Sequence, residues 1–348
     1  MANIRGYIGT YTKGDSKGIY SFTLNTDKQQ IEQVTVAAEL ENPTYLTVSE
    51  DQKFVYAVVK KGTQGGLAAY QIDSTTGALT LINQELADGA SPCHVSVDGE
   101  TTLAFTANYH KGTAEMYDID ADNGAIVRTL SQAQHEGTGP NEDRQEKPHT
   151  HFMGLSPDEK YAIAVDLGTD GIYTYTKESG KLELAHTFET KPGSGPRHLT
   201  FHPTKPLAYV MTELSSEVIV LRYFEEDGHF EEVQTISTIP SDFTENNQGS
   251  AIHVSSDGQF VYAGNRGHDS IAIFKTDADG KLSLVDIASS EGNWPRDFIL
   301  DPTEEFLVGS NQESSNLVLY KRDNETGKLT VLQSDIAVPH PVCVKFLG

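Results

Sequence analysis

The sequence predicts an all-β fold, a seven-bladed β-propeller with four antiparallel strands in each blade. A unit of roughly fifty residues recurs seven times and uses the whole chain of 348 residues. Each unit contains four short runs rich in β-branched and aromatic residues. The two ends of the chain also complement each other, because the chain begins with a strand of the second type and ends with a lone strand of the first type.

The most regular part of the unit is an acidic turn between its last two strands. Asp and Asn favour tight turns, and a glycine closes the turn in six copies. These glycines are Gly77, Gly124, Gly180, Gly228, Gly280 and Gly327. The copy nearest the N-terminus, SFTLN-TDKQQ-IEQV, lacks the glycine.

The copy after Gly195 illustrates the four expected strands in order: RHLTF (197–201), LAYVMTEL (207–214), EVIVLRYF (217–224) and FEEVQTIS (230–237). The opening run RGYIGTY (5–11) matches the second of these, and the closing run HPVCVKFLG (340–348) matches the first. We therefore expect the N- and C-terminal strands to complete the last blade together, which removes free sheet edges. A single domain over residues 1–348 follows.

Composition excludes several classes of partner. With 26 basic and 50 acidic residues the formal charge is −24, which argues against nucleic acid and anionic membranes. No apolar run is long enough to span a bilayer, and the N-terminus does not resemble a secretion signal. Cys93 and Cys343 are expected in blades 2 and 7, so we expect no disulfide and a cytoplasmic setting. The sequence carries no signal for an oligomeric state.

The propeller layout predicts where function lies. The first strand of each blade is nearest the axis, so starts of first strands and ends of second strands share one face. Polar side chains gather at these positions in blades 3 to 6: His149, His151, Arg197, Glu213, Arg266 and Arg296. Three of only eight arginines are among them. In so acidic a chain, this cluster predicts an anionic ligand, because guanidinium groups match carboxylate and phosphate.

Structural roles compete with functional ones at several of these positions. An arginine of the cluster can simply pair with Glu213. Asn108, Asn265 and Asn311 recur at strand ends and either cap a turn or bind ligand. His94 and His198 share a repeat position with Tyr45 and Asp297, which favours structural hydrogen bonds.

The longest irregular segment is expected at residues 131–147, directly before His149. A loop of this length inside a compact domain is commonly functional, so it either covers the pocket and contributes Arg144 or is a mobile insertion. Apart from His149 and His151 there is no close-spaced set of metal ligands. We therefore expect neither a metal nor another cofactor.

Several of these segments resemble the lactonase family of seven-bladed propellers, and the resemblance covers essentially the whole chain. They are IGTYT (8–12), RQEKPHTH (144–151), GPRHLTFHP (195–203), YVMTEL (209–214), VYAGNRGHDSIAIF (261–274) and NWPRDFILDP (293–302). The resemblance implies a lactone hydrolase, and the best-known activity of the family is that of 6-phosphogluconolactonase in the pentose phosphate pathway. A related fungal branch, the carboxy-muconate lactonizing enzymes, closes a lactone. Its proposed working residues match His151, Arg197, Glu213 and Arg266 here.

The expected reaction is hydrolysis of an anionic sugar lactone, most simply 6-phosphogluconolactone to 6-phosphogluconate. It needs an activated water and a stabilised oxyanion. Glu213 or His151 is the candidate general base, and Arg197 or Arg266 the candidate oxyanion group. The candidate substrate-binding residues are Arg144, His149, Asn265 and Arg296. No G-x-S-x-G motif is present, which favours direct attack by water.

Two other functions stay open at this point: a lactonizing or isomerising enzyme for a muconate-type dicarboxylate, and a non-catalytic binding platform. A protein-binding face usually offers aromatic anchors, and Trp294 is the only tryptophan. One departure from the family concerns the end of the second strand in blade 1. The family often has an Asn-Glu pair there, whereas this chain has Lys60 and Lys61, so the added charge is expected to alter substrate choice.

Overall fold

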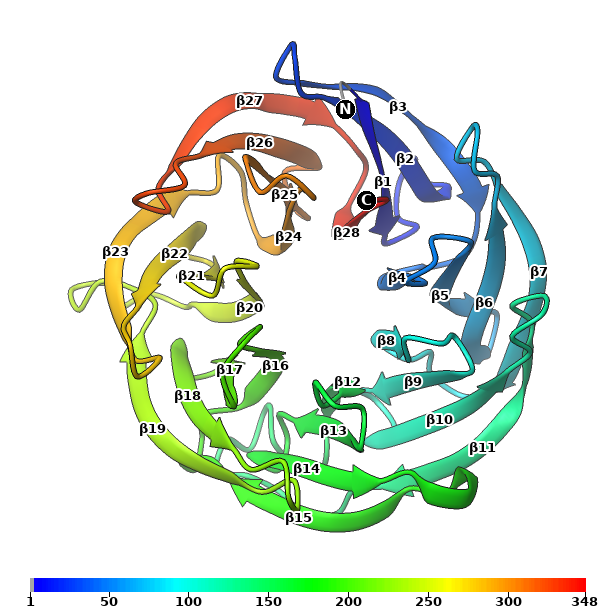
Figure 1. Ribbon diagram of the computed structural model, residues 1–348, viewed down its shortest axis with the longest axis vertical. Coiled ribbons are helices and arrows are strands. Elements are labelled where there is room, and N and C mark those ends of the chain that lie inside the picture. Colours follow the sequence, from blue (N-terminus) through cyan, green and yellow to red (C-terminus); the bar gives the residue numbers. More distant parts are fainter. Residues whose placement is uncertain (1–2) are drawn as a thin grey trace.

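The computed structural model describes residues 3–348 and confirms the predicted propeller. Seven antiparallel sheets of four strands are arranged in a ring around a central axis (Figure 1). Apart from a single 3-10 turn at Glu178–Gly180, the described residues form strands and the connections between them. No helix in this part of the chain has the length and apolar character needed to cross a bilayer.

The blades follow one another along the chain, and the first strand of each lies nearest the channel (Figure 1). Blade 1 contains β4 (Leu46–Val48), β5 (Phe54–Lys61), β6 (Gln64–Ile72) and β7 (Leu79–Asp88), and blade 2 contains β8 (His94–Val97), β9 (Leu103–Asn108), β10 (Thr113–Ile119) and β11 (Ile126–Gln134). Blade 3 contains β12 (Thr150–Leu155), β13 (Tyr161–Asp166), β14 (Gly171–Thr176) and β15 (Glu183–Glu189), and blade 4 contains β16 (Pro196–Phe201), β17 (Leu207–Thr212), β18 (Glu217–Tyr223) and β19 (Phe230–Ser237). Blade 5 contains β20 (Gln248–Val254), β21 (Phe260–Arg266), β22 (Ser270–Thr276) and β23 (Leu282–Ser289), and blade 6 contains β24 (Pro295–Leu300), β25 (Phe306–Asn311), β26 (Asn316–Arg322) and β27 (Leu329–Ala337).

Both ends of the chain build blade 7, as predicted. It contains β1 (Asn3–Thr10), β2 (Gly18–Asn25), β3 (Gln30–Glu39) and the C-terminal β28 (Pro341–Phe346). Strand β28 pairs with β1 in antiparallel register, with Val344 opposite Ile8. Figure 1 shows β28 beside β1 in this blade. The ring is therefore closed by backbone hydrogen bonds between the ends of the chain.

The acidic turns also connect neighbouring blades. Their glycines have positive φ, for example 72° at Gly77 and 73° at Gly124, which other residues adopt at a cost. The Tyr7 hydroxyl of blade 7 donates a hydrogen bond to the Gly77 carbonyl of blade 1 at 2.7 Å. Tyr56 of blade 1 repeats the contact with Gly124 of blade 2 at 2.9 Å. In the copy without glycine, Gln29 takes the left-handed conformation with φ 55°.

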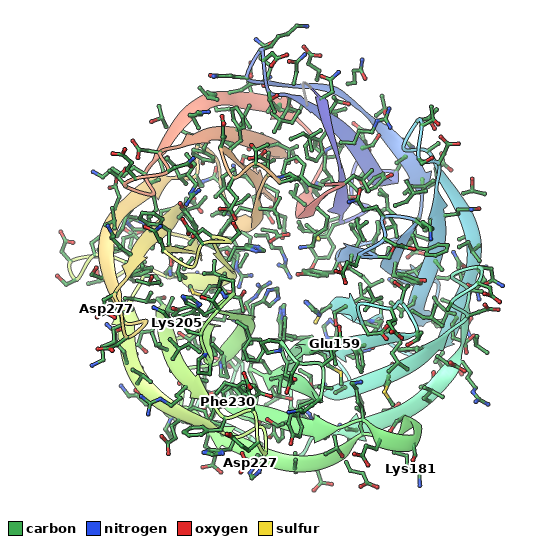
Figure 2. All side chains as sticks on the ribbon, viewed as in Figure 1. Glu159, Lys181, Lys205, Asp227, Phe230 and Asp277 are labelled. Atoms are coloured by element: carbon green, nitrogen blue, oxygen red, sulfur yellow. The ribbon has the colours of Figure 1, made fainter. Side chains whose placement is uncertain are left out.

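The hydrophobic core lies between adjacent blades rather than inside any one of them. Tyr209 and Val220 of blade 4, for example, are buried against Val261 and Phe274 of blade 5. Side chains fill the space between the sheets in Figure 2, whereas Asp227 and Asp277 of two acidic turns lie toward the periphery. Each blade thus covers the apolar face of the next, and much of the negative charge stays on the outside.

A β-bulge at the start of the first strand decides which side chains reach the channel mouth. In blade 3, Thr150 pairs with Asp166 and Phe152 with Val165, which leaves His151 as the extra residue. The same register shift leaves Arg197 extra in blade 4 and Arg296 extra in blade 6. A bulge bends its strand and redirects the extra side chain.

The long loop before β12 differs from its predicted bounds at one end. Residues 131–134 belong to β11, where Ser131 pairs with Met116, so the irregular segment begins at His135. Sequence patterning missed this because the end of β11, SQAQ (131–134), contains no β-branched or aromatic residue. The loop packs onto blade 3, since the side chain of the buried Gln145 donates to the Leu167 carbonyl at 2.8 Å.

Candidate active site

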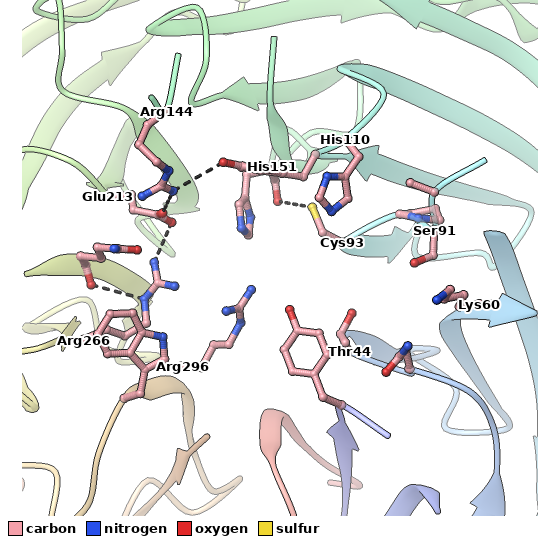
Figure 3. Close-up of a pocket in the computed structure, with 17 residues that line it drawn as sticks. Thr44, Lys60, Ser91, Cys93, His110, Arg144, His151, Glu213, Arg266 and Arg296 are labelled. Carbon is pink, nitrogen blue, oxygen red and sulfur yellow. Dashed lines mark hydrogen bonds and ion pairs between the residues drawn. The ribbon is translucent and has the colours of Figure 1, made fainter. Parts of the chain in front are cut away.

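A cavity of about 630 Å³ lies at the mouth of the channel (Figure 3). All seven blades contribute to it, through starts of first strands, ends of second strands and the loop before β12. This volume lies in the range of small-molecule sites. Its lining includes four cationic side chains, Lys60, Arg144, Arg266 and Arg296, against a single carboxylate, Glu213.

Glu213 is the centre of the charged cluster. It directly follows β17, is only 3% exposed, and faces three arginines. Its Oε2 lies 2.6 Å from Arg266 Nη2 and 3.1 Å from Arg197 Nε, and its Oε1 contacts Arg144 Nη2. Burial alone raises the pKa of Glu213, but the arginines outweigh it and hold the pKa well below its usual range. The carboxylate stays ionised and is a poor proton acceptor.

Two of these arginines are fixed by backbone carbonyls. Arg266, the last residue of β21, donates through Nη2 to the Gly249 carbonyl at 2.7 Å and lies 5.6 Å from the Trp294 ring centroid. Arg197 donates to the Ser250 carbonyl at 2.7 Å and is buried outside the cavity lining. Burial, followed by Arg266 beside it, lowers the pKa of Arg197 to about 9, which leaves the guanidinium charged at neutral pH.

Arg144 comes from the loop before β12 and lies next to Glu213 at the top of Figure 3. Its side chain is 29% exposed, and Nη2 also lies 3.5 Å from the Tyr109 hydroxyl. Backbone bonds from Arg144 and Gln145 to the Asn141 carbonyl, at 3.1 and 2.7 Å, form the turn that presents it. The loop therefore brings a cation to the cavity.

His151 points into the cavity from the bulge in blade 3 (Figure 3). It is buried, and neither ring nitrogen has a hydrogen-bond partner among the described residues. Burial, followed by the nearby Arg197, lowers the pKa of His151 well below its usual value. The ring is therefore neutral at physiological pH, and its nitrogens are not engaged by other side chains among the described residues.

We call Arg144, His151, Glu213 and Arg266 the arginine wall. With Arg296 they make up the five predicted residues that line the cavity, out of eight. Arg197, His149 and Asn265 do not line it. Arg197 contacts Glu213 at 3.1 Å but is not part of the lining, whereas Arg266 and Arg144 are.

His149 and Asn265 have structural partners instead. The His149 ring stacks on Tyr109 with centroids 4.2 Å apart, and its nitrogens bond to the Tyr109 carbonyl at 2.8 Å and to Glu146 at 3.0 Å. Asn265 donates to the Thr238 carbonyl at 2.9 Å and accepts from its hydroxyl at 2.7 Å. Asn265 therefore caps a strand end, the alternative that the repeat left open.

Some cavity residues were missed from the sequence. Tyr109 lies one residue beyond the strand-end position, and Trp294 two residues before Arg296. A wider window around the same repeat positions would have found both. Trp294 also has φ 66°, an unusual conformation for a bulky residue that is found at functional sites.

The described residues also bear on two other kinds of chemistry, attack by a cysteine thiol and catalysis by a bound metal. Cys93 lines the cavity, but burial raises its pKa to about 11, so its thiol stays protonated and is not a nucleophile. Within residues 3–348, no three His, Cys, Asp or Glu side chains lie close enough to form a metal site. Both cysteines are free.

Comparison with known proteins identifies the family of the chain. A model of the family described as "Lactonase, 7-bladed beta-propeller" matches residues 5–346. A 6-phosphogluconolactonase of Bacillus subtilis is 53% identical over 348 residues, which is 100% of this chain and 99% of that protein.

Solved structures match over the whole chain as well. A putative 6-phosphogluconolactonase of Bacteroides fragilis has a TM-score of 0.91 and 35% identity, over 100% of this chain and 98% of the other. The periplasmic gluconolactonase PpgL of Pseudomonas aeruginosa has a TM-score of 0.92 and 32% identity, over 99% of each chain. From its sequence and its architecture, the chain belongs to the lactonase family of seven-bladed β-propellers.

Proposed function

We propose that this protein hydrolyses 6-phosphogluconolactone to 6-phosphogluconate. The observation that carries the proposal is the cavity itself, which is lined by four cations, a single carboxylate and the buried, neutral ring of His151, whose nitrogens have no partner among the described residues. The name of the Bacillus subtilis relative supports this substrate. The two free cysteines agree with a cytoplasmic setting.

His151 is the proposed general base. Its neutral ring takes a proton from a water molecule that attacks the lactone carbonyl. Glu213 is unsuited to this role, because three guanidinium groups already share its charge. It instead positions Arg144 and Arg266 as a fixed set of donors.

The carbonyl oxygen gains negative charge as water attacks, and Arg266 is the proposed partner for it. Arg266 Nη1 has no hydrogen-bond partner among the described residues, whereas Nη2 is held by Gly249 and Glu213. A donor fixed in advance in a buried site stabilises the tetrahedral oxyanion without further rearrangement. The C–O bond of the ring then breaks, and the proton held by His151 returns to the leaving alkoxide.

The test is an assay of freshly prepared 6-phosphogluconolactone, with spontaneous hydrolysis subtracted. We expect His151→Gln to lower kcat by about 10²- to 10⁴-fold, the usual contribution of a general base. His110→Gln is the matched variant, because His110 also lines the cavity but is exposed and outside the arginine wall. An equal loss in both variants, or none in His151→Gln, contradicts the assignment.

The pH profile gives a second readout. A histidine base must be deprotonated, and the pKa of His151 is held well below 6.5. We therefore expect kcat/KM to keep its plateau at pH 6 and to fall only in more acidic solution. A half-maximal point at or above pH 6.5 would show that another group is the base.

A further inference from the structure

The side of the cavity opposite the arginine wall has a different character. Tyr11 follows β1, Thr44 precedes β4, Lys60 lies in β5 and Ser91 precedes β8. We call these four residues the donor wall. Lys60 and Ser91 lie across the pocket from Glu213 and Arg266 in Figure 3. The two walls are thus separated by the space that a ligand would occupy.

The polar groups of the donor wall have almost no partners within the protein. The hydroxyls of Tyr11, Thr44 and Ser91 make no hydrogen bond with any described residue, although each can donate one. Lys60 has a single contact, with Glu41 at 3.7 Å, and its side chain is 48% exposed. A ligand could therefore form hydrogen bonds with these groups without breaking existing hydrogen bonds within the protein.

Arg296 lies between the two walls and has no carboxylate partner among the described residues. Its guanidinium lies 5.5 Å from the Tyr11 ring centroid, and Nη1 contacts the Gln312 side chain at 3.3 Å. The bulge in blade 6 directs this side chain toward the channel mouth. Arg296 is thus a cation available to a ligand that also contacts the donor wall.

The charges of the cavity do not balance. With histidines neutral, its lining carries a net charge of +3 in a protein of charge −24. Arg144 and Arg266 share Glu213, which leaves a net charge of +1 at the arginine wall. The other two positive charges belong to Arg296, which has no carboxylate partner among the described residues, and to Lys60, whose one ion pair is with the exposed Glu41. A lactone carbonyl is uncharged, whereas a phosphate monoester carries about −1.5 to −2 at pH 7 and offers three strong acceptor oxygens.

Building on the proposed function, we infer that Lys60 and Arg296, with the hydroxyls of the donor wall, bind the phosphate of the substrate. The phosphate then lies at the far end of the cavity from His151. Lys60 is the specificity-determining residue, since it favours a phosphorylated lactone over an unphosphorylated one. It acts on substrate binding and not on the chemical step at the arginine wall.

The chain offers a matched control for this inference. Lys61 is the next residue of β5, is also exposed, and does not line the cavity, because neighbouring strand residues point to opposite faces. Lys60→Gln and Lys61→Gln remove the same charge from almost the same place. Only the first should affect a phosphate bound inside the cavity.

The experiment compares both variants and the wild type on 6-phosphogluconolactone and on unphosphorylated gluconolactone. For Lys60→Gln we expect KM for the phosphorylated lactone to rise about tenfold, with kcat nearly unchanged. KM for gluconolactone should stay the same, so the preference for the phosphorylated substrate falls about tenfold. Lys61→Gln should behave as wild type.

Two outcomes overturn the inference. One is an unchanged preference in Lys60→Gln. The other is a loss of preference in Arg144→Gln and not in Lys60→Gln, which would put the phosphate at the arginine wall. Titration with 6-phosphogluconate measures phosphate binding directly. It therefore tests the inference separately from the proposed hydrolytic activity. Even if the wild type hydrolyses neither lactone, the inference requires that Lys60→Gln weaken binding of this phosphate about tenfold, and that Lys61→Gln leave it unchanged.

Discussion

The arginine wall and the donor wall face the same cavity, but they are built in opposite ways. Glu213 is almost fully buried and shared by three guanidiniums, whereas Lys60 is half-exposed and contacts one exposed carboxylate at 3.7 Å. The arginine wall satisfies most of its polar groups internally, and this rigidity suits a site that stabilises charge during a reaction. The donor wall leaves its groups free, which suits recognition of a substrate group.

The largest expected difference between the walls concerns stability. Glu213→Gln keeps the shape of the side chain but leaves Arg197 and Arg266 buried without a counter-charge. Removal of one partner from a buried ion pair costs about 3–5 kcal/mol. On the donor side, Glu41→Gln removes the partner of Lys60, and an exposed pair contributes about 0–1 kcal/mol.

Urea unfolding of the two variants measures both values. We expect a large loss in the free energy of unfolding for Glu213→Gln and a change within error for Glu41→Gln. Similar losses of unfolding free energy in the two variants would contradict the view that the ion pairs of the arginine wall stabilise the fold more than the Lys60–Glu41 pair does. Activity measured on folded Glu213→Gln should also fall, because Arg144 and Arg266 lose their common anchor.

A second prediction concerns the histidines beside the arginine wall and along the channel. Burial, followed by charged neighbours, lowers the pKa of His94 to about 3, and the pKa values of His151 and His198 are also well below 6.5. Below pH 6.5 these histidines become protonated in the unfolded chain but stay neutral in the folded chain. The free energy of unfolding therefore falls as the pH falls. One such histidine lowers the free energy of unfolding by about 2 kcal/mol between pH 6.5 and 5.

Unfolding midpoints measured from pH 7 to pH 5 test this sign. Carboxylates contribute little in this window, since the pKa of Asp297 is about 2 when folded and near 4 when unfolded. His198→Asn removes one of these histidines, so the free energy of unfolding should fall less steeply with pH in this variant than in the wild type. A wild-type stability that is constant or rises toward pH 5 would contradict the burial of these rings as neutral species.

The sequence was sufficient for the ring and for much of the arginine wall. The acidic turns recur because each one needs a left-handed residue and accepts a bond from the next blade, as Gly77 does from Tyr7. Such local requirements repeat in every blade and are visible as a pattern. The shared position of first-strand starts and second-strand ends then located His151, Glu213 and Arg266 at one face.

The rest depends on side-chain direction, which repeats do not encode. His149 and His151 lie two residues apart, but only His151 occupies the bulge and reaches the cavity. Arg197 and Arg296 occupy equivalent bulges, and the difference lies in their neighbours: Glu213 and the Ser250 carbonyl hold Arg197 back, whereas no carboxylate holds Arg296. The contact with Ser250 spans 53 residues, from blade 4 to blade 5, so no local pattern predicts it.

The smallest expected effect on stability compares two threonines. Thr44 of the donor wall has a hydroxyl without a partner, so Thr44→Val should change the free energy of unfolding by less than about 0.5 kcal/mol. Thr212, directly before Glu213, donates to the Glu217 carbonyl at 3.0 Å and accepts from its backbone N–H at 2.9 Å. Thr212→Val removes both bonds from these part-buried backbone groups and should cost about 1–3 kcal/mol.

The same pair of variants should show the reverse order in substrate binding. If the Thr44 hydroxyl donates to a bound phosphate, its loss raises KM for 6-phosphogluconolactone by about 2- to 10-fold at full stability. Thr212 does not line the cavity, so folded Thr212→Val should keep a wild-type KM. Urea unfolding and steady-state kinetics on the two proteins decide the matter. A destabilised Thr44→Val, or an unchanged KM in it, would remove the distinction between a wall that holds itself together and a wall left open for the ligand.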